Sequence, residues 1–417
     1  MNRFHSTVAL AILMLIPAMA EDWPQWRGPQ RNGISKEKGL LQEWPKDGPK
    51  LLWSITNAGS GYSTPAVVGQ RLYLLGNEGL DNESVEALAV VDGKRVWSAK
   101  LGKVGNPKQN PNYPAARSTP TVDGDVLFAL SSDGDLACVE IANGKVRWQK
   151  NLRTDFGGKA GEWAYAESPL VDGNKVICTP GASDAAVVAL NKKSGELLWK
   201  CAVEGSDAAA YSSAIIVQAA GMKQYVQLLP KGLVGIEAET GKFLWRYPKA
   251  VSRYGANIPT PVASGETIYT ASAGTGGGLV RLKPKDGGGV QVEEVYFESK
   301  LPAAIGGVVK VGDYLYGTGQ AMLCLEFATG KVKWEERAIG AASLCFADGR
   351  LYLHGENGQV ALVEPSPDGY REKGRFAPPN PPERINQMEK AWAFPVVANG
   401  RLYLRDHGRV WCYDVKG

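Results

Sequence analysis

The feature that most constrains the fold is one spacing that recurs along the chain, a glycine followed four residues later by a tryptophan. It occurs in DGKRVW (92–97), NGKVRW (143–148), SGELLW (194–199), TGKFLW (240–245) and TGKVKW (329–334). The first three intervals between these tryptophans are 51, 51 and 46 residues. A spacing that returns at such intervals indicates one supersecondary unit used many times, so we expect a repeat protein.

Each repeat has the pattern of four short strands. A first strand follows a proline-containing segment such as STPAVV (63–68), and a turn such as Asp348-Gly349 leads into a second strand such as RLYLHG (350–355). Aspartate–glycine pairs adopt positive φ and suit two-residue hairpins. A third strand precedes the motif glycine, and the fourth ends at the tryptophan. Four antiparallel strands per repeat predict the blades of an all-β propeller.

The number of blades follows from the spacing. The gap from Trp245 to Trp334 is nearly double, which predicts one more repeat with Tyr296 in the tryptophan position. Two further repeats follow, and the last, 391–417, lacks a fourth strand. The segment GPKLLW (48–53) supplies a matching strand, so we expect it to pair with the last repeat and close the ring. The prediction is an eight-bladed β-propeller over residues 48–417, with four-stranded antiparallel blades.

The repeated tryptophans are assigned to the scaffold. We expect each glycine to form the turn between the third and fourth strands, and each tryptophan to bury its indole against the neighbouring blade. Cys138 and Cys324 stand six residues before a motif glycine, where a small residue is needed, and we expect all six cysteines to be buried free thiols. The predicted docking residues are Trp53, Trp97, Trp148, Trp199, Trp245 and Trp334.

The first twenty residues, MNRFHSTVALAILMLIPAMA, have the pattern of a secretory signal peptide. Arg3 gives a positive start, a short apolar run follows, and Ala18-Met19-Ala20 is a cleavage site with small residues. We expect cleavage after Ala20, export to the periplasm or beyond, and an N-terminal extension over 21–47. No later apolar run is long enough for a membrane span.

Composition argues against several classes of function. The formal net charge is only +4 and the charges are scattered, which does not favour binding to nucleic acid. Only His354 and His407 lie beyond the predicted signal peptide, which argues against a histidine-based triad or a multi-histidine metal site. No feature predicts an oligomer, and we expect a monomer.

The repeats resemble the PQQ-like β-propeller repeat, whose signature is Ala-x-Asp-x-x-Thr-Gly-x-x-x-Trp. The likeness is clearest in ALNKKSGELLW (189–199) and GIEAETGKFLW (235–245), and it covers roughly 48–417. Two groups share this repeat. Quinoprotein alcohol dehydrogenases hold pyrroloquinoline quinone (PQQ) and Ca²⁺, whereas scaffolds such as the outer-membrane assembly factor BamB have no enzymatic activity.

A candidate binding site lies where the segments between blades meet at one mouth of the channel, because propellers commonly bind ligands there. Three of these segments are long, 98–117, 149–166 and 377–391, which predicts a shaped funnel. Aromatic rings with a cation, a carboxylate and an amide could bind a polar planar ligand or a sugar, or they could pair with one another and fill the channel. The candidate residues are Tyr62, Arg117, Trp163, Tyr165, Glu167, Tyr211, Asn257 and Trp392.

The resemblance to quinoproteins implies Glu167 and Asn257 as calcium ligands and Arg117 beside the quinone. The catalytic aspartate of those enzymes has no match, although Asp155 or Asp207 could replace it from a linker, and no two cysteines are adjacent. We therefore assign no catalytic residue. The favoured hypothesis is an exported, non-enzymatic binding or scaffold protein with an envelope protein or a small polar ligand as its partner. The alternative is a PQQ- and Ca²⁺-dependent alcohol dehydrogenase.

Overall fold

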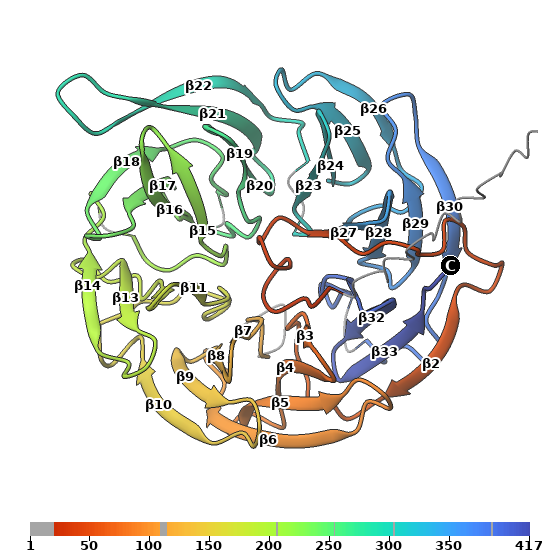
Figure 1. Cartoon of the computed structure of the whole chain (residues 1–417). Helices are drawn as coiled ribbons and strands as arrows, with labels where there is room; N and C mark the ends of the chain where they lie inside the picture. Colours follow the sequence, from red (N-terminus) through yellow and green to blue (C-terminus); the bar gives the residue numbers. More distant parts are fainter. Residues whose placement is uncertain (1–20, 109–114, 206, 254, 303–304, 385–386) are drawn as a thin grey trace, which may run out of the picture.

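The computed structural model describes residues 21–108, 115–205, 207–253, 255–302, 305–384 and 387–417. Within them, the strands form eight sheets around a central channel (Figure 1). This confirms the predicted eight-bladed β-propeller. No helix occurs in the described part of the chain, and accordingly none there could cross a membrane. The predicted signal peptide, 1–20, lies outside the described residues.

Blades 1 to 4 follow one another along the chain, and each contains four consecutive strands. Their strands are β3 (Ala66–Val68), β4 (Arg71–Asn77), β5 (Glu83–Ala89) and β6 (Arg95–Gly102); β7 (Thr121–Asp123), β8 (Val126–Leu130), β9 (Asp135–Glu140) and β10 (Val146–Asn151); β11 (Leu170–Asp172), β12 (Lys175–Cys178), β13 (Val187–Asn191) and β14 (Leu197–Cys201); β15 (Ile215–Ala219), β16 (Met222–Leu229), β17 (Gly232–Glu237) and β18 (Phe243–Tyr247).

Blades 5 to 8 complete the ring, and two of them receive a strand from the N-terminal part of the chain. Their strands are β19 (Val262–Ser264), β20 (Thr267–Ser272), β21 (Gly276–Pro284) and β22 (Val290–Glu298); β23 (Val308–Val311), β24 (Tyr314–Thr318), β25 (Met322–Glu326) and β26 (Val332–Glu336); β1 (Ile34–Ser35), β27 (Ala342–Ala347), β28 (Arg350–Gly355), β29 (Val360–Glu364) and β30 (Arg371–Phe376); β31 (Val396–Ala398), β32 (Arg401–Asp406), β33 (Arg409–Asp414) and β2 (Lys50–Ile55).

The ring is closed by pairing between the two ends of the propeller. Strand β2 lies antiparallel to β33, with Trp53 opposite Cys412 and Ile55 opposite Val410. Blade 8 therefore obtains its outer strand from residues that precede blade 1, as predicted. This pairing leaves no open sheet edge between the first and last blades.

Consecutive blades are joined by the glycine and tryptophan of the repeat. The Trp97 ring of blade 1 lies against Gly144 of blade 2, so a Cβ on Gly144 would be 2.7 Å from the ring. The Trp97 Nε1 donates a hydrogen bond of 2.9 Å to the Ile141 carbonyl, three residues before that glycine. The same contacts join Trp53 to Gly93 and Trp148 to Gly195.

The docking prediction extends to the blade without a tryptophan. Tyr296 lies against Gly330 and donates a hydrogen bond of 2.9 Å to the Phe327 carbonyl. Trp334 donates to Ser366, and Trp199 lies against Gly241 and stacks on Tyr225. Trp245 differs, because its Nε1 bonds to Gln224 of its own blade at 2.7 Å.

Small residues opposite the tryptophans make this packing possible. Trp97 pairs across the blade with Ala87, Trp148 with Cys138 and Trp334 with Cys324. All six cysteines are within the described residues, and all are buried free thiols. The apolar core lies mainly between blades, as where Tyr73 of blade 1 packs in one cluster with Leu127 of blade 2. Inter-blade packing therefore supplies most of the hydrophobic stabilisation.

The segment 21–47 crosses the middle of the channel before it reaches blade 8, as the red and orange trace in Figure 1 shows. Its backbone exchanges two hydrogen bonds with Val67, and the Arg31 side chain donates to the carbonyls of Ser168 and Pro169 at 2.7 and 3.0 Å. Strand β1 then pairs in parallel with β27. The segment thus contacts the innermost strands of several blades, or the residues next to them, across the channel.

Candidate functional site

A cavity of about 820 Å³ opens where the segments that lead into the blades converge. We call it the funnel. Five of the eight predicted site residues line it: Tyr62, Arg117, Trp163, Tyr211 and Trp392. They come from segments far apart in the sequence and are brought together because every blade begins near the same mouth of the channel. This volume is within the usual range for pockets that bind small molecules.

Aromatic rings form much of the wall of the funnel. The Tyr62 and Trp392 ring centres are 5.1 Å apart, and those of Trp163 and Tyr211 are 5.7 Å apart. The Tyr211 hydroxyl accepts a hydrogen bond from the Trp163 backbone N–H at 3.1 Å. Burial raises the pKa of Tyr62 to about 12, so its hydroxyl is neutral at physiological pH. The aromatic part of the wall is therefore flat, mostly apolar and uncharged.

Arg117 adds a cation to this wall. Its guanidinium carbon lies 4.8 Å from the centre of the Tyr62 ring, a cation–π contact. Burial lowers the pKa of Arg117, with partial compensation from Tyr62, Tyr211 and Glu83. An arginine nevertheless remains protonated at neutral pH.

The other three predicted residues do not line the funnel. Tyr165 is buried between blades 2 and 3, and its hydroxyl donates to the Pro180 carbonyl at 2.9 Å. Glu167 accepts hydrogen bonds from the Thr179 backbone N–H and hydroxyl, and it lies 3 % exposed. Burial raises the pKa of Glu167 to about 7 despite these bonds. Both side chains stabilise the junctions between strands.

The side chain of Asn257 is also hydrogen-bonded within the protein. Its Oδ1 accepts from the Ser252 backbone N–H and from the Ser272 hydroxyl, both at 2.7 Å, and its Nδ2 donates to the Leu229 carbonyl at 2.9 Å. Every hydrogen-bonding position of the amide oxygen is thus used. Asn257 holds the segment before blade 5 in place.

Several residues that line the funnel were not predicted from the sequence. Phe394 directly precedes Pro395 and Ile258 lies three residues before Pro261, the prolines next to β31 and β19, so a closer study of those segments could have found them. Trp26 carried no such signal, because the segment 21–47 does not repeat. Its Nε1 donates to the Thr260 hydroxyl at 2.8 Å, and its ring lies edge-on to Phe394 at 4.6 Å.

The two described histidines lie outside the funnel lining and are buried. Burial lowers the pKa of His407 to about 4 and also lowers that of His354, so both are neutral at physiological pH. The His354 Nδ1 lies 3.1 Å from the Ala393 carbonyl, which fixes the ring. The His407 ring lies 5.2 Å from the ring of Tyr62, which lines the funnel.

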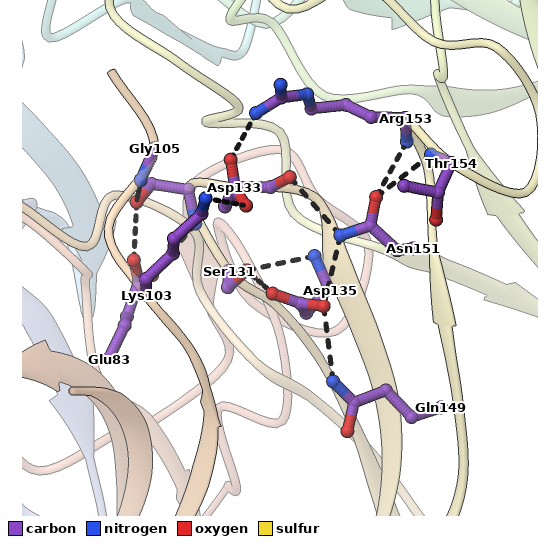
Figure 2. A network of polar contacts seen from close by, with 11 residues as sticks. Glu83, Lys103, Gly105, Ser131, Asp133, Asp135, Gln149, Asn151, Arg153 and Thr154 are labelled. Atoms are coloured by element: carbon purple, nitrogen blue, oxygen red, sulfur yellow. Dashed lines mark hydrogen bonds and ion pairs between the residues drawn. The ribbon is translucent and has the colours of Figure 1, made fainter. Parts of the chain in front are cut away.

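A second cavity, of about 750 Å³, lies beside the funnel among the segments of blades 1 to 3. Figure 2 shows its polar network, in which Asp133 pairs with both Lys103 and Arg153. Asn151 donates to Asp135 at 3.0 Å. The Gly105 backbone N–H donates to Ser132 at 2.9 Å. These groups bind one another and so stabilise the loops between blades.

Comparison with known proteins places the chain in a family. A family model described as outer membrane protein assembly factor BamB matches residues 34–167 and 118–335, together more than half of the chain. The chain belongs to this family. The BamB of Burkholderia pseudomallei is 21% identical over 260 residues, which cover 59% of this chain and 60% of that protein. The chain covers less than two thirds of the length of the curated BamB relatives it matches.

Solved structures share the fold of this BamB-family chain. BamB from Moraxella catarrhalis superposes with a TM-score of 0.61 at 15% identity, covering 88% of this chain and 97% of that one. Quinohemoprotein alcohol dehydrogenase ADHIIG from Pseudomonas putida HK5 gives a TM-score of 0.62 at 12% identity, covering 95% and 80%. At these identities the likeness is one of fold, and the site residues must decide between the two groups.

The residues of this BamB-family chain do not fit a quinone–calcium site formed by Glu167 and Asn257. The amide oxygen of Asn257 already accepts two hydrogen bonds, and both Glu167 oxygens accept bonds from Thr179. Neither residue lines the funnel. A Ca²⁺ ion needs six to eight oxygen ligands, and both side chains would have to break buried bonds to provide them.

Proposed function

We propose that this chain is an exported, non-enzymatic binding and scaffold protein of the cell envelope, and that the funnel is its binding surface. The observation that carries the proposal is the division of roles among the candidate residues. The rings and Arg117 line an open cavity, whereas the acid and amide that could serve chemistry are bonded within the blades. Membership of the BamB family supports a scaffold role.

The partner is proposed to be another envelope protein or a small ligand held in the funnel, with the chain acting as a monomer. Exposed side chains at the mouth provide a contact surface, among them Met388, which is 52% exposed. Apolar and aromatic groups around a concave site are what a binding surface requires. The segment 149–166 and the described residues of 377–391 would supply the rim.

Site-specific photocrosslinking in cells tests this proposal. A benzophenone amino acid replacing Met388 should give an adduct with a distinct envelope protein. The matched control places it at Leu197, which is 46% exposed on the outer strand β14. An adduct at residue 388 but not at residue 197 supports the proposal. Equal labelling at both positions, or no adduct at either, contradicts a partner at the funnel.

Export is tested separately by fractionating cells and determining the N-terminus of the mature protein. We expect a soluble periplasmic or extracellular chain that begins at Glu21, since the predicted cleavage follows Ala20. Recovery of the intact leader in the cytoplasm would contradict export and, with it, the envelope role.

The dehydrogenase alternative is favoured by one observation, the likeness of fold to a quinohemoprotein alcohol dehydrogenase. Thermal unfolding with PQQ, with and without Ca²⁺, tests it in the wild-type chain and in Glu167→Gln. A ligand at 100 times its Kd stabilises a protein by about 2.7 kcal/mol. A Ca²⁺-dependent rise in Tm that the variant lacks, followed by dye-coupled alcohol oxidation, would replace the scaffold proposal with the dehydrogenase.

A further inference from the structure

We infer that the funnel binds an organic anion, in which a carboxylate contacts Arg117 and a flat, apolar body lies against the aromatic walls. This inference deepens the proposed function and rests on it. The hydrogen-bonding groups in the funnel wall, and not only the shape of the cavity, determine which ligand it can hold.

The first observation is the state of the Arg117 side chain. Its Nε and Nη2 are buried and have no hydrogen-bond partner among the described residues, and no carboxylate there lies within 4 Å of it. Arg384 offers a contrast in the same region, since its two terminal nitrogens both bond to Asp406. Arg117 contacts the face of Tyr62 and has donors left over.

Unpaired buried donors are costly, because they have lost their bonds to water without replacement. A carboxylate is the acceptor that matches a guanidinium best, since its two oxygens can accept two parallel N–H bonds. Glu83 is the acid whose negative charge raises the pKa of Arg117. Its two oxygens, however, already accept hydrogen bonds from the Ser132 N–H and hydroxyl. The chain thus leaves the partner of Arg117 to be supplied from outside.

The second observation is another unused donor in the same wall. The Trp163 Nε1 is buried without a hydrogen-bond partner in the described part of the chain, while its ring packs against Tyr211. Arg253 and the acid of the lining, Glu162, are both exposed. The less exposed groups, Arg117 and Trp163, therefore offer hydrogen-bond donors and one positive charge, a combination that selects an anion.

The body of the ligand follows from the rest of the lining. Trp26, Phe394 and Trp392 present ring surfaces, and Ile258 and Ile305 add aliphatic groups. Flat apolar surfaces gain most from burial against such rings. A neutral sugar could also stack here, but it would supply no charge to Arg117. The combination favours an aromatic or other flat apolar carboxylate.

Titration of the full mature chain with 2-naphthoate, followed by calorimetry in Ca²⁺-free buffer, tests this inference. The neutral isostere 2-naphthamide is the matched ligand. We expect 2-naphthoate to bind at least about tenfold more tightly than the amide, because only the carboxylate pairs with the guanidinium. The preference should weaken as salt concentration rises.

Variants assign the preference to the named groups. Arg117→Gln should reduce 2-naphthoate binding about tenfold and leave naphthamide binding unchanged, while Trp163→Phe should cost a few-fold. Arg153→Gln is the control, since Arg153 pairs with Asp133 outside the funnel. Arg117→Lys keeps the charge without the planar fork, so it should retain part of the preference and provides a second test if Arg117→Gln does not fold.

Equal affinity for the carboxylate and the amide, tighter binding of a neutral disaccharide, or a preference that survives in Arg117→Gln would overturn the inference. None of these outcomes contradicts the proposed scaffold function. A crosslinked envelope partner at residue 388 without 2-naphthoate binding would sustain the scaffold and remove the ligand class. Ca²⁺-dependent PQQ binding with alcohol oxidation would end the proposed function itself.

Discussion

Two sets of tryptophans in this chain differ in what surrounds them. Those of the repeat lie at the outside of the ring, and most donate their indole N–H to a backbone carbonyl of the next blade. Those of the funnel lie at the inside, where Trp163 has a buried N–H without a partner in the described chain. The same side chain joins blades in one region and faces an open cavity in the other.

A residue type that recurs with the repeat marks the contacts between blades, whereas the funnel residues differ in type from one blade to the next. An outer tryptophan must meet a glycine of the next blade, so it recurs with the repeat. A funnel residue need only point toward the axis, and tyrosine, tryptophan or arginine can do so from different blades. Substitutions should therefore affect the two sets differently.

Trp97→Ala should have the largest effect, lowering the free energy of unfolding by about 3–5 kcal/mol, because it leaves a cavity between blades 1 and 2 and an unpaired Ile141 carbonyl. Trp163→Ala is the matched change in the funnel and should cost about 1 kcal/mol or less, since that ring already borders a cavity. Urea unfolding measures both. Similar losses would show that the two sets do not differ as described.

Gly144→Ala tests the other half of the inter-blade contact. Gly144 has φ +78°, and a Cβ there would lie 2.7 Å from the Trp97 ring, so we expect a loss of about 2–3 kcal/mol. Gly124→Ala is the control, because Gly124 has φ +63° but nothing within 4 Å of the added carbon. It should lose only about 1 kcal/mol, from backbone strain alone. Equal losses of unfolding free energy in the two variants would show that the contact with the Trp97 ring is not the cause.

A buried carboxyl group and a surface carboxyl group should contribute oppositely to the pH dependence of stability. Burial raises the pKa of Glu83 to about 7, so between about pH 4.5 and 7 the folded chain holds more protons than the unfolded chain. The free energy of unfolding should therefore fall as pH rises through this window. In Glu83→Gln that share of the fall, about 1–3 kcal/mol, should be missing when urea unfolding is compared at pH 4.5 and 7.5.

Glu140→Gln is the control on the outer surface. Hydrogen bonds from Asn143 and then Arg147 lower the pKa of Glu140, so this group favours the folded state at higher pH, the opposite sign. If Glu83→Gln retained the full pH dependence of the wild type, the buried carboxyl would not be its source.

The smallest change in stability is expected from substitutions that remove only the N–H of an indole. Trp148→Phe removes the hydrogen bond of 3.0 Å to the Lys192 carbonyl and should cost about 1 kcal/mol. Trp163→Phe removes an N–H that has no partner among the described residues, so its effect on the Tm should be within the error of calorimetry. A larger loss for Trp163→Phe would contradict the unused donor on which the ligand inference depends.

The propeller could be predicted from the sequence because its contacts repeat. The strand GPKLLW (48–53) was recognisable as the missing part of the last blade, and it pairs with β33. Tyr296 could be placed by counting, since the blade without a tryptophan still needs a ring against Gly330. The repeat in the sequence identifies these positions because each blade contacts its neighbour through the same positions of the repeat.

The funnel could be predicted only in part. The alignment of the repeats shows that Tyr62, Arg117 and Glu167 all lie near the same end of their blades, but it does not show which way each side chain turns. Glu167 turns toward Thr179 because its own blade offers two donors there. Trp26 reaches the funnel through contacts distant in sequence, which no local pattern records.

The path of the segment 21–47 has a consequence for how the protein is made. These residues are synthesised before any blade, yet their partners include β27 and the neighbourhood of Val415, near the other end of the chain. Contacts between such distant residues slow folding, because a long loop must close before they can form. We expect the ring to remain open on the ribosome and to become native only after the whole chain has been released.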